Sequence, residues 1–130
     1  MTAVLLDTHV LHWWSTDATK LSPVAAAAID EADHVTVSAI TWFELSWLAR
    51  HERILLTIPV GTWLEQMAGQ VETVGITPAI ADAAVSLPAT FPADPMDRLI
   101  FATAVERGCR LITKDGALRS HRVPRPVALW

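Results

Sequence analysis

The chain has 130 residues, of which 52% are apolar, and its formal net charge is −4. This length and apolar content fit one domain, residues 1–130, with its own core, and they exclude an intrinsically disordered chain. No uncharged apolar run reaches the about 18 residues of a membrane-spanning helix, and the start of the chain lacks the pattern of a secretory signal. Cys109 is the only cysteine, so the sequence predicts a cytoplasmic protein with a buried structural thiol and no internal disulfide.

The first third of the chain predicts two strands separated by two helices. Residues 3–6 are apolar and end at an acid, which is typical of a buried strand, and residues 8–14 follow as a helix. Ser22 before Pro23 is a helix cap followed by proline, and it predicts a helix over residues 24–33. The β-branched residues 35–37 predict the second strand.

The remaining elements continue this alternation. A long helical pattern covers residues 38–53, an extended or loop segment covers 54–58, and a helix with Trp63 and Leu64 buried covers 59–68. Thr77-Pro78 and Asp94-Pro95 are further cap signals that predict helices at 79–87 and 94–107, the second of which ends at Gly108. The other later segments are a strand at 71–76, a strand at 110–113, a short turn or helix at 115–118 and a strand at 127–130. Alternating strands and helices predict an α/β fold whose parallel central sheet of about four to five strands carries helices on both faces.

Four acidic residues stand where a predicted strand ends or a helix begins: Asp7, Glu44, Asp97 and Asp115. Parallel strands bring their carboxyl ends to one edge of the sheet, where ligands bind. Two carboxylates about 4 Å apart repel by roughly 4 kcal/mol at an effective dielectric near 20. A hard cation such as Mg²⁺ or Mn²⁺, which prefers oxygen ligands, would offset that repulsion.

Each acid also has a purely structural explanation. Asp7 fits the N-cap of the helix that starts at Thr8, and Asp115 fits a turn before Gly116. The pattern Thr41-x-x-Glu44 fits a capping box inside the third helix.

The acids near position 95 have structural explanations of the same kind. Asp97 lies in a first helical turn behind the cap Asp94, where the helix dipole favours an acid, and Asp94 is spaced to pair with Arg98. These explanations remain compatible with metal binding, because a helix N-terminus keeps a carboxylate ionised. Thr113 is a plausible hydroxyl partner for one of the carboxylates.

Other kinds of site find little support. The sequence has no glycine-rich phosphate loop and no nucleophile elbow, and only His9 and His12 are spaced to share a zinc ion. Residues 98–130 carry seven basic and two acidic side chains, so this basic third either faces phosphates or balances the acidic remainder as a solvated surface. Six tryptophans and no tyrosine indicate a subunit or partner surface as well as core.

Taken in series, four segments resemble the PIN-domain ribonucleases, and more narrowly the VapC toxins of bacterial type II toxin–antitoxin systems. The segments are residues 5–9 (LLDTH), 37–45 (VSAITWFEL), 94–104 (DPMDRLIFATA) and 111–115 (LITKD). The resemblance implies a PIN-like fold in which Asp7, Glu44, Asp97 and Asp115 are catalytic and metal-binding. It also places Thr8, Thr113 and Asp94 beside those acids as supporting residues.

The resemblance further implies an Mg²⁺- or Mn²⁺-dependent endoribonuclease that hydrolyses RNA phosphodiesters and so restricts translation and growth. Its partners would be an RNA substrate, a cognate VapB-type antitoxin and a second copy of the chain, with no membrane. Basic residues such as Lys114 and Arg119 would hold the RNA backbone. Two alternatives stay open at this point: a PIN-fold module that binds RNA without cleaving it, and a receiver-type phosphoacceptor domain.

Overall fold

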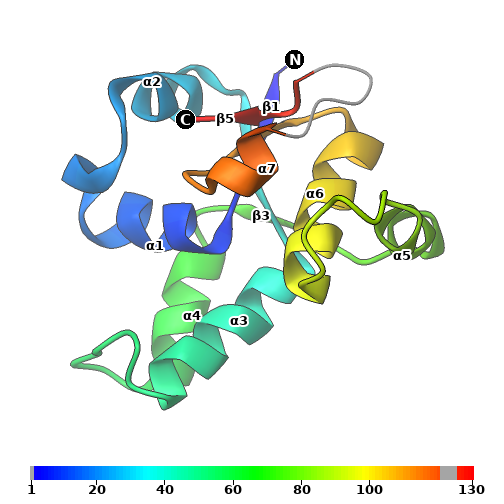
Figure 1. Cartoon of the computed structure of the whole chain (residues 1–130). Coiled ribbons are helices and arrows are strands. Elements are labelled where there is room, and N and C mark those ends of the chain that lie inside the picture. Colours follow the sequence, from blue (N-terminus) through cyan, green and yellow to red (C-terminus); the bar gives the residue numbers. More distant parts are fainter. Residues whose placement is uncertain (1, 121–125) are drawn as a thin grey trace.

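The computed structural model describes residues 2–120 and 126–130, and within these ranges five strands form one parallel sheet in the order β3-β2-β1-β4-β5 (Figure 1). The strands are β1 (Ala3–Leu6), β2 (His34–Ser38), β3 (Glu72–Val74), β4 (Arg110–Ile112) and β5 (Ala128–Leu129). The helices are α1 (Thr8–Thr16), α2 (Pro23–Glu31), α3 (Ala39–Arg50), α4 (Val60–Ala68), α5 (Pro78–Val85), α6 (Pro95–Arg107) and α7 (Gly116–Ser120), with a short 3-10 turn at Ala18–Lys20. The predicted α/β architecture with a parallel sheet is confirmed.

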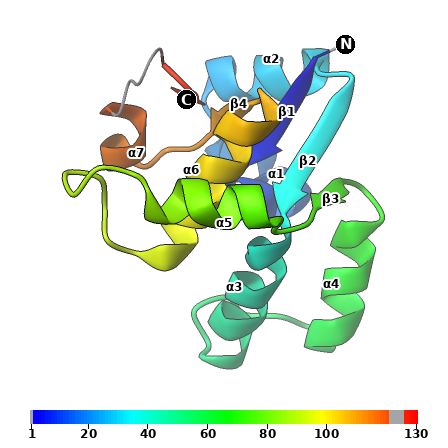
Figure 2. The same cartoon turned by 90° about the vertical axis from the view of Figure 1, so that its right-hand side faces the viewer.

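Alternate residues of β1 feed two hydrophobic clusters, because successive side chains of a strand point to opposite faces of the sheet. Val4 and Leu6 pack in a cluster with α1, α2, α3 and α4. Leu5 packs in the other cluster, with α5, α6 and α7. Figure 2 shows α5 and α6 on the near side of the sheet and the pair α3 and α4 projecting below it. Helices therefore cover both faces of the sheet.

The cap signals in the sequence set most helix starts. The side chains of Ser22, Thr77 and Asp94 each accept a hydrogen bond from a backbone amide in the first turn of the helix that follows, and proline occupies an early position in all three helices. At the other end, α6 stops at Gly108, whose φ of 66° is left-handed and suits glycine. The strand at 110–113 and the buried Cys109 are likewise confirmed.

Two predictions about the third helix are wrong. The helix starts after Ser38, whose hydroxyl accepts from the Ile40 amide at 3.3 Å, so Thr41 is not its cap. It ends at Arg50 rather than at residue 53, and residues 54–58 form a loop with bends, which is one of the two conformations predicted for them. The local capping-box pattern misleads here because β2 continues to Ser38, and that serine takes the capping role first.

The tryptophans divide between core and surface. Trp63 is buried in the core, as predicted, whereas Leu64 is only partly buried. Trp47 on α3 is 43% exposed, and Phe43 on the same helix is 59% exposed. No helix in the described part of the chain is long and apolar enough to cross a membrane.

Candidate functional site

Asp7 lies at the carboxyl end of β1 and is held from two sides. Its amide donates to the carbonyl of Ile112 at 3.0 Å, which extends the pairing of β1 with β4. Its Oδ1 accepts from the Thr8 amide at 2.8 Å, and its Oδ2 accepts from the Thr113 hydroxyl at 2.6 Å. Asp7 is therefore the N-cap of α1 and at the same time a carboxylate at the open edge of the sheet.

Asp115 follows β4 and is also tied to Thr113. The Thr113 hydroxyl accepts from the Asp115 amide at 3.1 Å while it donates to Asp7. Asp115 Oδ1 accepts from the amides of Ala117 and Leu118 at 2.9 and 3.4 Å. The predicted turn role of Asp115 is confirmed, and the buried Thr113 links this acid to Asp7.

Asp94 and Asp97 open α6. Asp94 Oδ1 accepts from the amides of Met96 and Asp97 at 2.8 and 3.3 Å, which confirms Asp94 as the helix cap. Asp97 lies in the first turn of the helix. The expected pairing of Asp94 with Arg98 is wrong, because the Arg98 guanidinium donates instead to five backbone carbonyls. These carbonyls belong to Ala84, Leu87, Pro88, Phe91 and Pro92, at 2.9–3.3 Å.

Glu44 reaches the same region from α3. Burial raises the pKa of its carboxyl, a hydrogen bond from the Thr8 side chain acts against this, and the charge of Asp7 raises it further. Behind it, the buried hydroxyls of Thr8 and Thr41 lie 3.2 Å apart. Thr41 thus helps to pack α3 against the start of α1, a contact that the sequence pattern did not reveal.

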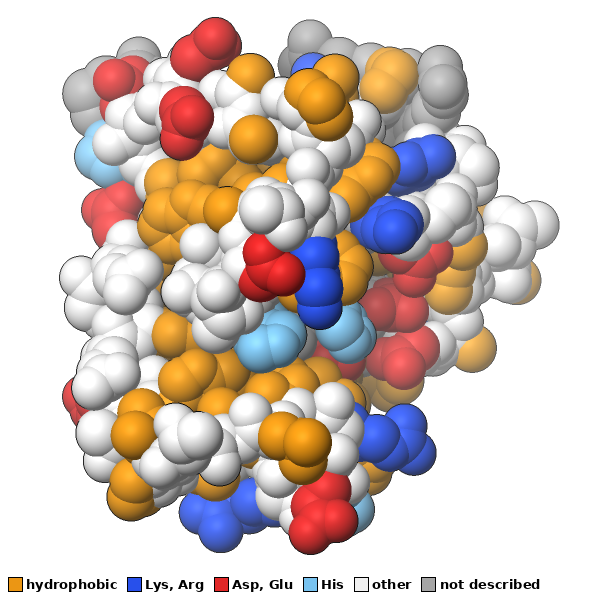
Figure 3. Space-filling view, turned by 90° about the vertical axis from the view of Figure 1, so that its left-hand side faces the viewer, with side chains coloured by type: hydrophobic (Ala, Val, Ile, Leu, Met, Phe, Trp, Pro, Cys, Tyr) orange, Lys and Arg blue, Asp and Glu red, His pale blue; other side chains and the backbone are white. Residues whose placement is uncertain are grey.

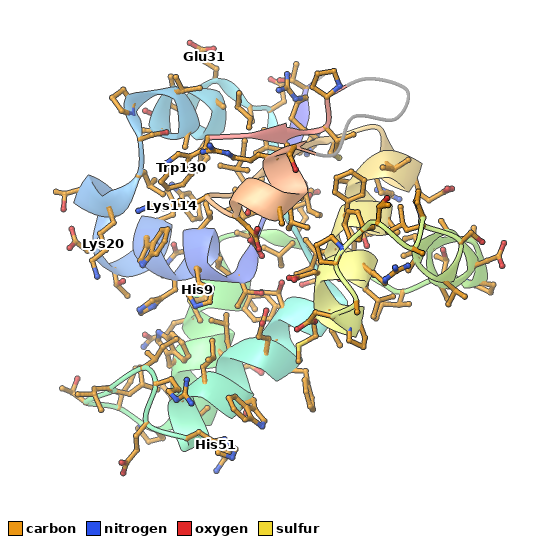
Figure 4. All side chains as sticks on the ribbon, in the orientation of Figure 1. His9, Lys20, Glu31, His51, Lys114 and Trp130 are labelled. Atoms are coloured by element: carbon orange, nitrogen blue, oxygen red, sulfur yellow. The ribbon has the colours of Figure 1, made fainter. Side chains whose placement is uncertain are left out.

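The pKa of Asp97 is affected by the charges of four other acids. Its pKa is raised from 3.8 to about 7, first by burial and then by the charges of Asp94, Asp7, Asp115 and Glu44. Burial also raises the pKa of Asp7, against the hydrogen bonds from Thr113 and Thr8. The charges of Asp7, Glu44, Asp94 and Asp115 thus all act on Asp97, and these five acids are called the acidic cluster below. Figure 4 shows oxygen-bearing side chains gathered between the start of α1, α3 and α6.

The chemistry of this acidic cluster fits a hard divalent cation, because carboxylate oxygens are the ligands that Mg²⁺ and Mn²⁺ prefer. However, no three Asp, Glu, His or Cys side chains in the described residues lie close enough together to form a ready-made metal site. Carboxylates without a counter-charge repel one another, and Asp7 and Asp115 are turned toward a hydroxyl and backbone amides. The donor set is therefore suitable in kind but is not preassembled.

The histidines of α1 have separate environments. His9 is exposed, and its charge lowers the pKa of both Asp7 and Glu44. Burial lowers the pKa of His12, whose ring lies edge-on to Trp63 and whose buried Nδ1 has no hydrogen-bond partner among the described residues. Sequence reasoning considered His9 only as half of a zinc pair and missed its place beside the acids; its position two residues after Asp7 was the available signal.

The basic residues of the last third and one cavity are not part of the acidic cluster. Lys114 is exposed and its ammonium lies 5.9 Å from the ring centroid of Trp13, and Arg119 is exposed on α7. Arg122 and Arg125, counted in the basic third, lie outside the described residues. A cavity of about 560 Å³, lined by Ala3, His34, Cys109 and others, contains none of the predicted acids.

Comparison with known proteins gives consistent matches over nearly the whole chain. A family model for the PIN domain matches residues 4–123. The curated protein "Ribonuclease VapC22" from Mycobacterium tuberculosis is 61% identical over 130 residues, which is all of both chains. Among solved structures, DNA-bound VapBC from Salmonella typhimurium matches with a TM-score of 0.73 and 19% identity, covering 99% of this chain and 98% of that one. A toxin–antitoxin complex from Klebsiella pneumoniae matches with a TM-score of 0.72 and 20% identity, covering 98% and 96%.

Proposed function

Because this chain belongs to the PIN domain family and, within it, to the VapC ribonucleases, we propose that it is a metal-dependent endoribonuclease and the toxin of a toxin–antitoxin pair. The receiver-domain alternative is removed, since the PIN family model matches almost the whole length. The 61% identity to a full-length ribonuclease supports RNA as the substrate.

One observation supports the catalytic assignment most strongly. Burial, and after it the charges of four other acids, raises the pKa of Asp97 to about 7. Each uncompensated carboxylate pair costs free energy, and strong perturbation of this kind is typical of functional sites. We assign Asp7, Glu44, Asp97 and Asp115 as the catalytic, metal-binding acids, with Asp94, Thr8 and Thr113 supporting them.

Hydrogen bonds within the chain would hold the acidic side chains in position before RNA binds. Thr113 holds Asp7 and positions the backbone of Asp115, while Thr8 contacts both the Thr41 hydroxyl and Glu44. When bound, one or two Mg²⁺ or Mn²⁺ ions would activate water and neutralise charge on the phosphodiester. Water would attack the phosphorus in line, the bond to the 3′ oxygen would break and a proton would pass to that oxygen, which leaves a 5′ phosphate and a 3′ hydroxyl.

The protein partners follow from the same relatives. The similar solved structures are toxin–antitoxin complexes, and we propose a cognate VapB-type antitoxin and a homodimer for this chain. Exposed apolar side chains on and after α3, namely Phe43, Trp47 and Leu55, are suited to such contacts. Sedimentation that gives only a monomer at micromolar concentration would reject the dimer.

The nuclease proposal is tested by RNA cleavage with and without Mg²⁺ or Mn²⁺. We expect metal-dependent cleavage of single-stranded RNA that leaves 5′ phosphates, stops with EDTA and is lost in Asp7→Asn. Asp82→Asn, which alters an exposed acid on α5, is the matched control and should cleave normally. RNA binding without cleavage at any metal concentration would instead favour the binding-module alternative.

A further inference from the structure

Trp13 on α1 is the centre of a mixed aromatic and cationic cluster. Its ring lies 6.0 Å from the ring of His9, one helical turn earlier, and 5.9 Å from the ring of Trp130 at the end of the chain. The Lys114 ammonium lies 5.9 Å from the Trp13 ring centroid, within the range of a cation–π contact. Residues from three distant parts of the sequence therefore meet around one indole.

This Trp13 cluster borders the acidic cluster on two sides. Lys114 stands between Thr113, which donates to Asp7, and Asp115. His9 lies close enough to Asp7 and Glu44 for its charge to lower the pKa of both. In Figure 4, Lys114 and Trp130 lie between α1 and α2, and His9 lies on α1. On the face in Figure 3, histidines border a column of acidic side chains, with Lys or Arg side chains above it.

The members of the Trp13 cluster are open to solvent to different degrees. His9 and Lys114 are exposed, whereas Trp13 and Trp130 are half-buried against the core. A half-buried indole packs against the core on one side and still presents part of its surface to solvent. By contrast the guanidinium of Arg98, also part of the basic third, already donates to five backbone carbonyls. Lys114 is therefore the better placed of these two cations to meet a phosphate.

We propose that the Trp13 cluster binds an unpaired nucleotide of the RNA next to the scissile phosphate, with the base stacked on Trp13 or His9 and a phosphate held by Lys114. This inference rests on RNA being the substrate, as proposed above. Aromatic side chains bind bases of single-stranded RNA through stacking, which tolerates many sequences. The lysine supplies positive charge that an edge of carboxylates lacks, and so lets a polyanion approach.

The test measures RNA binding rather than cleavage. Fluorescence anisotropy in EDTA would compare a labelled ten-nucleotide RNA of mixed sequence with an abasic ribose–phosphate chain of the same length. We expect Trp13→Leu to weaken binding of the base-containing RNA by about 5-fold or more, the lower bound for one stacked base. Binding of the abasic chain should stay unchanged, and Trp13→Phe should restore most of the lost affinity.

Two matched controls separate stacking from general damage. Trp42→Leu removes another half-buried tryptophan, whose Nε1 donates to the Thr73 hydroxyl at 3.0 Å beside β3, across the sheet from β4 and β5, and should bind both chains normally. Lys114→Met should reduce the slope of log Kd against log salt by about 0.7, the value for one phosphate contact to a single strand, whereas Arg53→Met should not.

Two results would overturn the proposal, and a third would separate it from the nuclease function. Equal loss of affinity for both chains in Trp13→Leu would mean that the fold is damaged rather than a base contact removed. Unchanged affinity for both would leave the Trp13 cluster to another contact, such as the antitoxin. Base-dependent binding through Trp13 in a protein that never cleaves RNA would support the Trp13 cluster while rejecting the nuclease function, so the two failures are distinguishable.

Discussion

The Thr113 hydroxyl donates a 2.6 Å hydrogen bond to Oδ2 of Asp7, which joins residues 106 positions apart in the chain. The bond connects the ends of β1 and β4, and it lowers the pKa of an acid that burial otherwise raises. The same hydroxyl accepts from the Asp115 amide. A single threonine thus orients one acid and positions the backbone of another.

Thr113→Val should therefore impair the site more than it impairs the fold. The change keeps the shape of the side chain and removes both hydrogen bonds, so we expect activity or metal affinity to fall by about 10- to 100-fold, as for other residues that orient metal ligands. The free energy of unfolding should fall by about 1–3 kcal/mol, because polar groups lose their partner. Cleavage rates and urea denaturation measure the two effects.

Thr36→Val is the matched control for that prediction. Thr36 is also a buried strand threonine, and its hydroxyl donates to the Val4 carbonyl at 2.8 Å, away from the acidic cluster. It should lose comparable stability and keep full activity per folded molecule. Equal loss of activity in the two variants would reduce Thr113 to a general packing role.

Asp97 should make the metal-free protein less stable as the pH rises. Its pKa is 3.8 ordinarily and about 7 in the folded chain, so between these values the folded state binds the proton more tightly than the unfolded state. Stability therefore falls as the pH climbs through that window and is lowest above it. Asp97→Asn removes this penalty, which near pH 8 amounts to about 1–2 kcal/mol in the free energy of unfolding, a reduced figure because solvent screens the half-exposed side chain.

Urea denaturation in EDTA at about pH 5 and about pH 8 checks the Asp97 prediction. Losing a favourable charge from the first helical turn costs only about 0.3–1 kcal/mol, so the net change near pH 8 should still be stabilising, and the variant should show a flatter pH dependence. Asp82→Asn should leave that dependence as it is. A variant that is less stable than the parent near pH 8 would show that repulsion within the acidic cluster is weaker than the raised pKa of Asp97 indicates.

The sequence predicts those features of the fold that depend on neighbouring residues. Val4, Leu5 and Leu6 form a strand buried on both faces, and Ser22, Thr77 and Asp94 cap helices where the local pattern places them. The Thr41 capping box failed because its outcome depends on where β2 ends. The order of the strands brings Asp7 and Asp115 together at one edge, since β1 and β4 are adjacent.

The parts of the site that sequence did not predict depend on contacts across the fold. The turn of Arg98 away from Asp94 requires the loop before α6 to fold back so that its carbonyls surround the guanidinium. The contact between the Thr8 and Thr41 hydroxyls requires α1 and α3 to cross at that point. Likewise, the spacing of the carboxylates follows from side-chain torsions, which a pattern of residues along the chain does not fix.

Arg98→Lys should loosen the segment before α6. Arg98 donates from all three of its guanidinium nitrogens to carbonyls of residues 84–92, and a lysine carries the charge but only three donors at one atom. We expect a loss of about 1.5–3 kcal/mol in the free energy of unfolding and faster hydrogen exchange in residues 84–94. Arg107→Lys, at an exposed arginine on the same helix, should change neither. Unaltered hydrogen exchange in Arg98→Lys would show that residues 84–94 keep their conformation without the hydrogen bonds of the guanidinium.

Glu44→Gln distinguishes a site role for this acid from a role in starting α3. Ser38 caps the helix, and the pKa of Glu44 is raised by burial and by Asp7, so removing its charge should not destabilise the helix. We expect activity to fall at least about 10-fold with no loss of stability, since one carboxylate is withdrawn from the acidic cluster.

Ser38→Ala should do the opposite, costing about 1 kcal/mol through the lost cap with activity per folded molecule preserved. If Glu44→Gln instead unfolds more easily and cleaves normally, the acid serves the helix, and the remaining three acids with Asp94 must account for metal binding.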